Sequence, residues 1–217
     1  MRYVERAGTS STRATEVIDA QYGGLLTTSA SVLVVTRSWH RADGRIVPGG
    51  RTYDVRLSTR GRGWHVDSVN PSRPGAPARS VSAAARRVLD SDRIDLPPAA
   101  RRDVQSDSVH GSVLAAMLTV SRAHRIGISV IRSGHPLYVF GTTRPSDHPQ
   151  GRAFDTWQID GHPVVDARTP RSLVTDYMHA VAAAGSYNVG GPYLLGSTPQ
   201  WFSDDTHHDH VHAGFTG

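Results

Sequence analysis

The sequence predicts an α+β protein, in which a small antiparallel sheet with flanking helices is preceded by an N-terminal β-meander. Three observations predict this class. Residues 31–70 alternate apolar and polar residues with a period of two, which is typical of half-buried strands. The chain after residue 80 mixes helical apolar stripes with strand-like segments. Apolar residues make up 38% of the 217-residue chain, which is enough to form a core.

The N-terminal region is expected to contain one short helix and three strands. The helix is predicted around Thr12 to Gln21. The strands are "SVLVVTRSW", "RTYDVRLST" and "GWHVDSV", and the segments between them are rich in the turn residues Gly, Pro and Asp. This pattern predicts a three-stranded antiparallel meander.

The segment "NPSRPGAPARS", residues 70–80, contains three prolines and a glycine between the two patterned regions, as linkers do. A chain of 217 residues is long enough for one domain or two modest ones. We therefore predict an accessory region at residues 1–78, made of the helix and the meander, and a second domain at residues 79–217.

The second region begins with a helix near residues 81–89, a break at "LPPAA", and a helix over about residues 109–123. The strand "IGISVIR" follows. Residues 152–166 are expected to form a hairpin, because Asp160-Gly161 is a favoured two-residue turn. A helix is then predicted from Thr169 to Gly185, with Pro170 in its first turn, and the run "HHDHVHAGF" is predicted to be a short terminal strand.

Composition limits the chemistry and the partners. The chain has 24 basic and 19 acidic residues, a net charge of +5, and every basic residue is Arg. This charge favours anionic partners such as nucleic acid or anionic cell-wall polymers, although an Arg-rich composition is also typical of GC-rich genomes. Because the chain has no Cys, a metal site must use His, Asp or Glu. No apolar run is long enough for a membrane span, and the first residues lack the apolar core of a signal peptide, so we expect no unaided export.

The stretch "SDHPQGRAFD", residues 146–155, separates two potential metal ligands by small residues. His148 and Asp155 stand seven positions apart, with Gly151 and Ala153 between them. Alternation along the predicted hairpin arm places Ala153 and Asp155 on one face, and Gly151 permits a sharp turn with close backbone approach. This spacing leaves room for an ion.

The C-terminal run "THHDHVHAGF" contains four of the twelve histidines of the chain. His210 and His212 share one face of an extended strand. The run could be a solvated His-rich tail, but Val211 and the apolar residues that follow it favour a strand packed on a core.

Taken together, the two motifs resemble those of a family of zinc peptidases. The stretch "SDHPQGRAFD" matches every fixed position of the S-x-H-x-x-G-x-A-x-D signature, and "HVH" is similar to the H-x-H strand that completes the metal site of the family. The family includes D-alanyl-D-alanine carboxypeptidases, phage L-alanyl-D-glutamate endopeptidases, murein endopeptidase and the Hedgehog signalling domain. The resemblance covers residues 80–217.

The resemblance implies a Zn²⁺ site whose protein ligands are His148, Asp155 and His212. Such a set leaves a fourth position for water, which distinguishes a catalytic zinc from a structural one. Zinc lowers the pKa of bound water to about 7 and polarises a carbonyl group.

The catalytic acid–base role has three candidates, all of which precede the last ligand in the sequence. Many members of the family have Glu three positions before the last ligand, where this chain has Asp209. The murein-endopeptidase branch has histidines two and five positions before it, matching His210 and His207. Strand alternation would place Asp209 opposite His212 unless the strand begins after it. We therefore favour His210, with Asp209 as the alternative.

The resemblance identifies the substrate-binding residues less directly than the metal ligands. The carboxypeptidase branch has an S-G-Y-R element whose Arg binds the terminal carboxylate, but "RSGHP" has Pro136 in that position. Arg132, Arg144 or Arg152 could replace it, because a guanidinium binds a carboxylate through two parallel hydrogen bonds. Of these we select Arg132, together with Ser146, which either binds a ligand or caps the loop. His135 is expected to line the cleft or to form a turn.

The resemblance implies a zinc-dependent peptidase that hydrolyses a peptide bond of bacterial peptidoglycan, as an endopeptidase rather than a D,D-carboxypeptidase. It would act as a monomer at the cell envelope or after secretion, with the peptidoglycan peptide as its partner. The alternative is a zinc-binding module of the same fold without hydrolysis. A nucleic-acid binder is not favoured, since no basic helix concentrates the charge.

Overall fold

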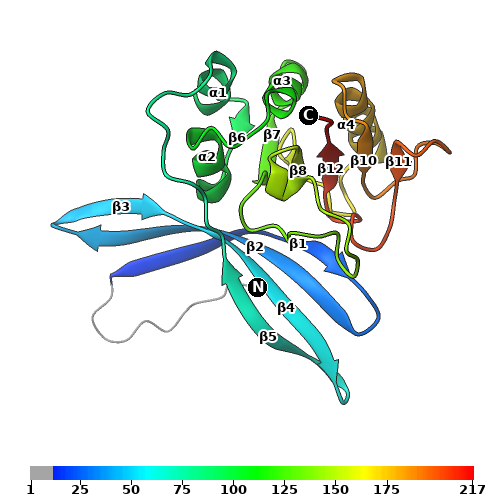
Figure 1. Ribbon diagram of the computed structural model, residues 1–217, viewed down its shortest axis with the longest axis horizontal. Helices are drawn as coiled ribbons and strands as arrows, with labels where there is room; N and C mark the ends of the chain where they lie inside the picture. Colours follow the sequence, from blue (N-terminus) through cyan, green and yellow to red (C-terminus); the bar gives the residue numbers. More distant parts are fainter. Residues whose placement is uncertain (1–11) are drawn as a thin grey trace.

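The computed structural model describes residues 12–217 and has a mixed α+β architecture with two mainly antiparallel sheets (Figure 1). The prediction about a signal peptide concerns the first seventeen residues, of which 1–11 lie outside the described residues. The first sheet has five strands: β1 (Arg13–Leu25), β2 (Ser29–Ala42), β3 (Arg45–Gly49), β4 (Thr52–Arg60) and β5 (Gly63–Pro71). Its order is β1-β2-β4-β5, with β3 paired to β2.

The second sheet has seven strands and carries the later part of the chain. Its order is β11-β10-β12-β8-β7-β6, with β9 paired to β8. The strands are β6 (Ile94–Asp95), β7 (Ile126–Val130), β8 (Ala153–Ile159), β9 (His162–Pro163), β10 (Asn188–Gly190), β11 (Trp201–Phe202) and β12 (Val211–Gly214). Its helices are α1 (Ala83–Leu89), α2 (Pro98–Gln105), α3 (Gly111–Val120) and α4 (Arg171–Ala183). Within the described residues, no helix is long and apolar enough to cross a membrane.

The helix predicted for Thr12 to Gln21 is wrong, because these residues belong to strand β1. β1 pairs antiparallel with β2 from Arg13–His40 to Leu25–Ala30, with irregularities in the register near Val17 and Tyr22. The segment contains good helix formers, but the hydrogen bonds to a long neighbouring strand decide its conformation. The N-terminal region is therefore a five-stranded sheet and not a three-stranded meander.

Most elements predicted after residue 80 are confirmed. α1, α3, α4, β7 and β12 lie where helices and strands were expected. In the β8–β9 hairpin, Asp160 and Gly161 both have positive φ, 50° and 84°, as the predicted two-residue turn requires. The sequence pattern does not predict α2, because the prolines of "LPPAA" indicate a break. Pro98 in fact occupies the first turn of this helix, where its missing N–H costs nothing.

The two faces of β8 face different layers. Phe154 belongs to the main core with residues of all four helices, and the hydroxyl of Thr156 bonds the hydroxyl of Tyr177 on α4 at 2.8 Å. Asp155, between them, points to the opposite face. On β12, Val211 and Ala213 likewise belong to the core, and His212 is paired with Asp155 across the strands. The helices thus cover one face of the second sheet, and the candidate residues lie on the other.

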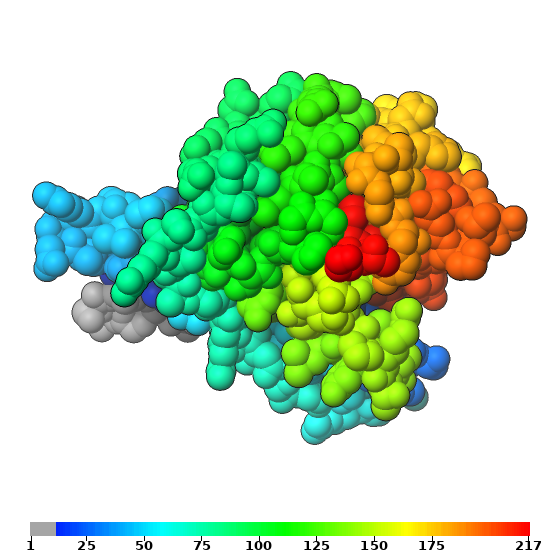
Figure 2. All heavy atoms as spheres, turned by 45° about the horizontal axis from the view of Figure 1, so that its top comes forward, coloured from blue at the N-terminus to red at the C-terminus, as the bar shows by residue number. Residues whose placement is uncertain are grey.

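The N-terminal sheet lies against that other face. Leu33 and Val35 of β2 are fully buried against Val130 of β7. Figure 1 shows the long strands of the first sheet below the helical layer, and Figure 2, with the helical side forward, shows the light-blue hairpin of β2 and β3 projecting away from the rest. The region at residues 12–78 therefore packs directly on the second region, beside the candidate residues.

Candidate metal site and cleft

The predicted ligands His148, Asp155 and His212 come together on the face of the second sheet opposite the helices. The His148 Nε2 atom lies 3.1 Å from His212 Nδ1 and 3.1 Å from Asp155 Oδ1, and His212 Nδ1 lies 3.0 Å from Asp155 Oδ1. Three ligands at the bond lengths usual for tetrahedral zinc would stand about 3.3 Å apart. The three side chains therefore fit a small metal ion.

His148 is presented by a tight turn. It opens a short 3₁₀ helix (His148–Gln150) that ends at Gly151 in the left-handed conformation. Its Nδ1–H donates a hydrogen bond to the carbonyl of Ile131 at 2.8 Å. The Nδ1 atom must carry the proton, so the Nε2 lone pair is directed at Asp155 and His212.

The protonation states of Asp155 and His212 also suit the binding of a cation. Burial raises the pKa of Asp155, but the electrostatic effect of the neighbouring imidazole groups of His148 and His210 outweighs this and holds the pKa well below its usual value. Burial lowers the pKa of His212 to about 4, against the opposing effect of Asp155. At neutral pH the site thus offers a carboxylate and a neutral imidazole, which are the forms that bind metals.

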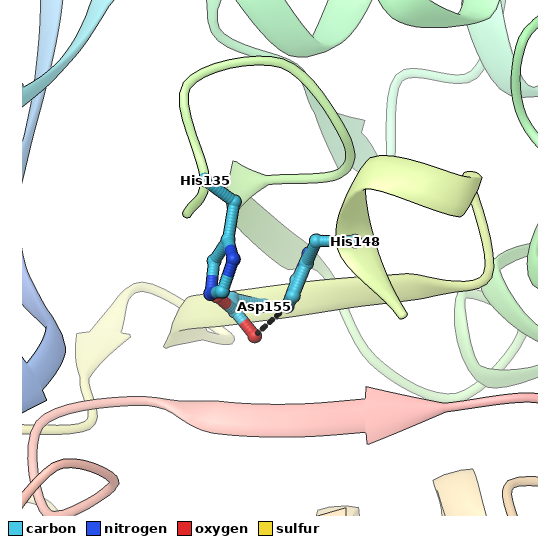
Figure 3. A group of neighbouring side chains, drawn as sticks. All are labelled: His135, His148 and Asp155. Atoms are coloured by element: carbon cyan, nitrogen blue, oxygen red, sulfur yellow. Dashed lines mark ion pairs between the residues drawn. The ribbon is translucent and has the colours of Figure 1, made fainter. Parts of the chain in front are cut away.

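His135 is a further neighbour, and it forms a candidate metal-binding group with His148 and Asp155 (Figure 3). Its ring stacks on His148 with 4.1 Å between centroids. The donor atoms of this group lie within 4.8 Å of one another, whereas those of the set with His212 lie within 3.1 Å. His212 therefore has the better geometry for a third ligand. Sequence reasoning missed His135 as a candidate ligand, because no motif spacing connects it to the other two.

His210 lies beside the ligands and is held by Asp209. Its Nδ1–H donates to Asp209 Oδ1 at 2.6 Å, while its Nε2 lies 3.8 Å from Asp155 Oδ1. The other oxygen of Asp209 accepts the backbone N–H of Tyr22 at 2.9 Å. Strand β12 begins only at Val211, so alternation does not fix the direction of Asp209, and its two oxygens are used to hold His210 and β1.

His207 and Asp19 lie near His210, and both are partly exposed. His207 Nδ1–H donates to Asp204 at 2.7 Å, and its ring lies 5.1 Å from that of His210; burial lowers its pKa despite the carboxylate. Asp19 of β1 has one carboxylate oxygen that is buried without a hydrogen-bond partner among the described residues. Burial raises the pKa of Asp19 to about 7, and His210 opposes this rise.

A cleft of about 960 Å³ opens over the candidate ligands. Its walls come from the end of β1, the loop between β7 and the 3₁₀ helix, the start of β10 and the segment before β12. They include Tyr22, Phe140, Arg144, Tyr187 just before β10, Phe202 and His207. Ser146 also lines the cleft, and its hydroxyl contacts His135 Nδ1 at 3.3 Å and the N–H of His148 at 3.4 Å. A cavity of this size accommodates a peptide of a few residues.

The structure does not place Arg132 in this cleft. Its Nε–H donates to the carbonyl of Pro149 at 3.2 Å, and it lines a separate cavity of about 270 Å³. Its backbone N–H is bound by the buried carboxylate of Asp103 on α2, which fixes the direction of the chain after β7. Arg144, the second of the three sequence candidates, does line the cleft.

The turn at Gly151 yields a stability prediction. Gly151 has φ 71°, and a Cβ atom there would lie 2.1 Å from the carbonyl oxygen of Ser108. We expect Gly151→Ala to lower the free energy of unfolding by at least ~2 kcal/mol, from a clash with backbone added to left-handed strain. Chemical denaturation would measure it.

Gly161→Ala is the matched control for this variant. Gly161 also has positive φ, 84°, but a Cβ there would meet nothing within 4 Å. Its loss should be limited to about 1 kcal/mol of conformational strain. Equal losses in the two variants would show that close packing at Gly151 is unimportant.

Comparisons of the chain with protein-family models, with curated proteins and with solved structures found no match. A functional assignment must therefore rest on the geometry and chemistry of the site.

Proposed function

We propose that the chain is a zinc-dependent peptidase that hydrolyses a peptide bond of bacterial peptidoglycan at the cell envelope. The observation that carries the proposal is the juxtaposition of His148, Asp155 and His212 with a carboxylate-bound histidine, His210, in a peptide-sized cleft. The ligand set and the acid–base candidate are separate groups, as hydrolysis requires.

The three ligands would hold zinc, which supplies a Lewis acid and an activated water when a coordination position is open. His210 is the group placed to receive and return the proton, because its Nε2 faces the ligand cluster. Asp209 holds the ring by its Nδ1–H and stabilises the protonated form. His207 lies beside the His210 ring and forms part of the cleft wall.

We propose an endopeptidase and not a D,D-carboxypeptidase. Pro136 stands where the carboxypeptidases that the sequence resembles have their carboxylate-binding Arg. Arg144 on the cleft wall is suited to bind a side-chain carboxylate of the stem peptide. We therefore propose Arg144 in place of Arg132 as a substrate-binding residue. Ser146, which lies beside the ligands, stays a candidate for the same role.

Digestion of purified peptidoglycan tests the proposal. The zinc-loaded protein is expected to release peptide fragments whose masses identify the bond that is cut, and the metal-stripped protein is expected to release none. Zinc-loaded protein that leaves the wall peptides intact would favour the non-catalytic zinc-binding module instead. Absence of zinc binding would contradict both.

A further inference from the structure

We infer that Gln21, on the first strand of the N-terminal sheet, is a positioning residue for the metal ligand Asp155. This inference rests on the proposed zinc site. The side-chain amide of Gln21 donates from Nε2 to Asp155 Oδ2 at 2.7 Å, across 134 positions of sequence. Both side chains are about 1% exposed, so water does not compete for this bond.

The hydrogen bond divides the two oxygens of Asp155 between two tasks. Oδ2 is held by Gln21, and Oδ1 is the atom that stands 3.0 Å from His212 Nδ1 and 3.1 Å from His148 Nε2. With Oδ2 held, the carboxylate cannot rotate freely and presents one oxygen to the ion. Hydrogen bonds of this kind to ligating carboxylates tune metal sites.

The amide of Gln21 is itself held in one orientation. Its Oε1 accepts a hydrogen bond from the hydroxyl of Ser129 on β7, and this hydroxyl also lies 3.2 Å from the backbone carbonyl of Asp155. A flipped amide would place its oxygen against an oxygen of the Asp155 carboxylate, which can only accept. The carboxylate therefore selects the orientation in which Gln21 donates to it, and the Ser129 hydroxyl then donates to the amide oxygen.

The same strand touches the site a second time, through the bond from the Tyr22 N–H to Asp209. Two consecutive residues of β1 thus hold the carboxylates of the metal ligand and of the His210 partner. The N-terminal sheet is consequently a part of the site and not only a neighbour of the zinc-binding region.

Zinc affinity of a Gln21→Met variant tests the inference, because Met keeps the length and removes the donor. We expect chelator competition to show a 10- to 100-fold loss of Zn²⁺ affinity, the usual effect of removing an outer-shell partner. The visible absorption of the Co²⁺-substituted protein, which depends on coordination number, should change as well.

Thr36→Val is the matched control. Thr36 on β2 is 5% exposed, and its hydroxyl bonds the backbone of Arg51, away from the ligands. This variant loses a buried hydrogen bond of the same sheet and should keep both the Zn²⁺ affinity and the Co²⁺ spectrum of the wild type. Equal affinity losses in the two variants would overturn the inference, since they would report general destabilisation.

The remaining outcomes separate this inference from the proposed function. Wild-type protein that takes up no Zn²⁺ overturns both. Wild-type protein that binds Zn²⁺, with a folded Gln21→Met that binds it equally well, overturns the role of Gln21 alone. If Gln21→Met does not fold, Ser129→Ala decides: a several-fold loss of affinity supports the inference, and an affinity within twofold of wild type overturns it.

Discussion

Substitution of His212 by Ala is expected to lower Zn²⁺ affinity by more than ~100-fold, and the hydrolytic activity with it. The proposed site has three protein ligands, and His212 is one of them, so the loss should exceed the 10- to 100-fold effect typical of outer-shell partners. Asp155→Ala should behave in the same way, because its Oδ1 atom lies within 3.1 Å of both other donor atoms. Native protein should bind about one zinc per chain, as measured by elemental analysis.

His135→Ala distinguishes the two candidate ligand sets. His135 belongs to a group with His148 and Asp155 whose donor atoms lie within 4.8 Å of one another, and its Nδ1 is engaged with the carbonyl of Pro136 at 3.0 Å. We expect this variant to keep most of the Zn²⁺ affinity. Exposed His162 supplies the control, since His162→Ala should be without effect. A larger loss in His135→Ala than in His212→Ala would reverse the assignment of the third ligand.

Substitution of His210 should separate metal binding from catalysis. His210→Ala leaves His148, Asp155 and His212 in place, so zinc should stay bound while turnover falls by ~100-fold or more, the usual scale for a positioned acid–base group. Zinc content and turnover on peptidoglycan should be measured on the same preparation.

Asp209→Asn is expected to keep zinc and to lose less activity than His210→Ala. Asp209 touches the far nitrogen of the His210 ring, at 2.6 Å, and acts through it. Exposed His208, in the same run, gives the control variant His208→Ala, which should keep native turnover. Native turnover in both His210→Ala and Asp209→Asn would show that the proton-transfer assignment is wrong.

Local patterns in the sequence were sufficient for much of the second region. The β8–β9 hairpin follows from Asp160-Gly161, and strand alternation alone places Asp155 and His212 on faces that can meet. The small residues of "SDHPQGRAFD" permit the turn at His148, and Gly151 there is left-handed. These features depend on neighbours in the chain, so they can be predicted from spacing.

Contacts between distant segments decided the rest. The β conformation of residues 13–25 depends on pairing with β2, and α2 places Asp103 under the chain after β7. The path of this segment after β7 also decides that Arg144 lines the cleft and Arg132 does not.

The sequence by itself supplied the candidate ligands and acid–base groups through its resemblance to a family of zinc peptidases, because the motifs that carry the resemblance are local. Only the tertiary structure decided that Asp209 holds His210 and that Gln21 holds Asp155. The second bond joins residues 134 positions apart on two different sheets. Such a contact exists only when both sheets pack together, and the packing depends on the whole buried interface and not on any motif.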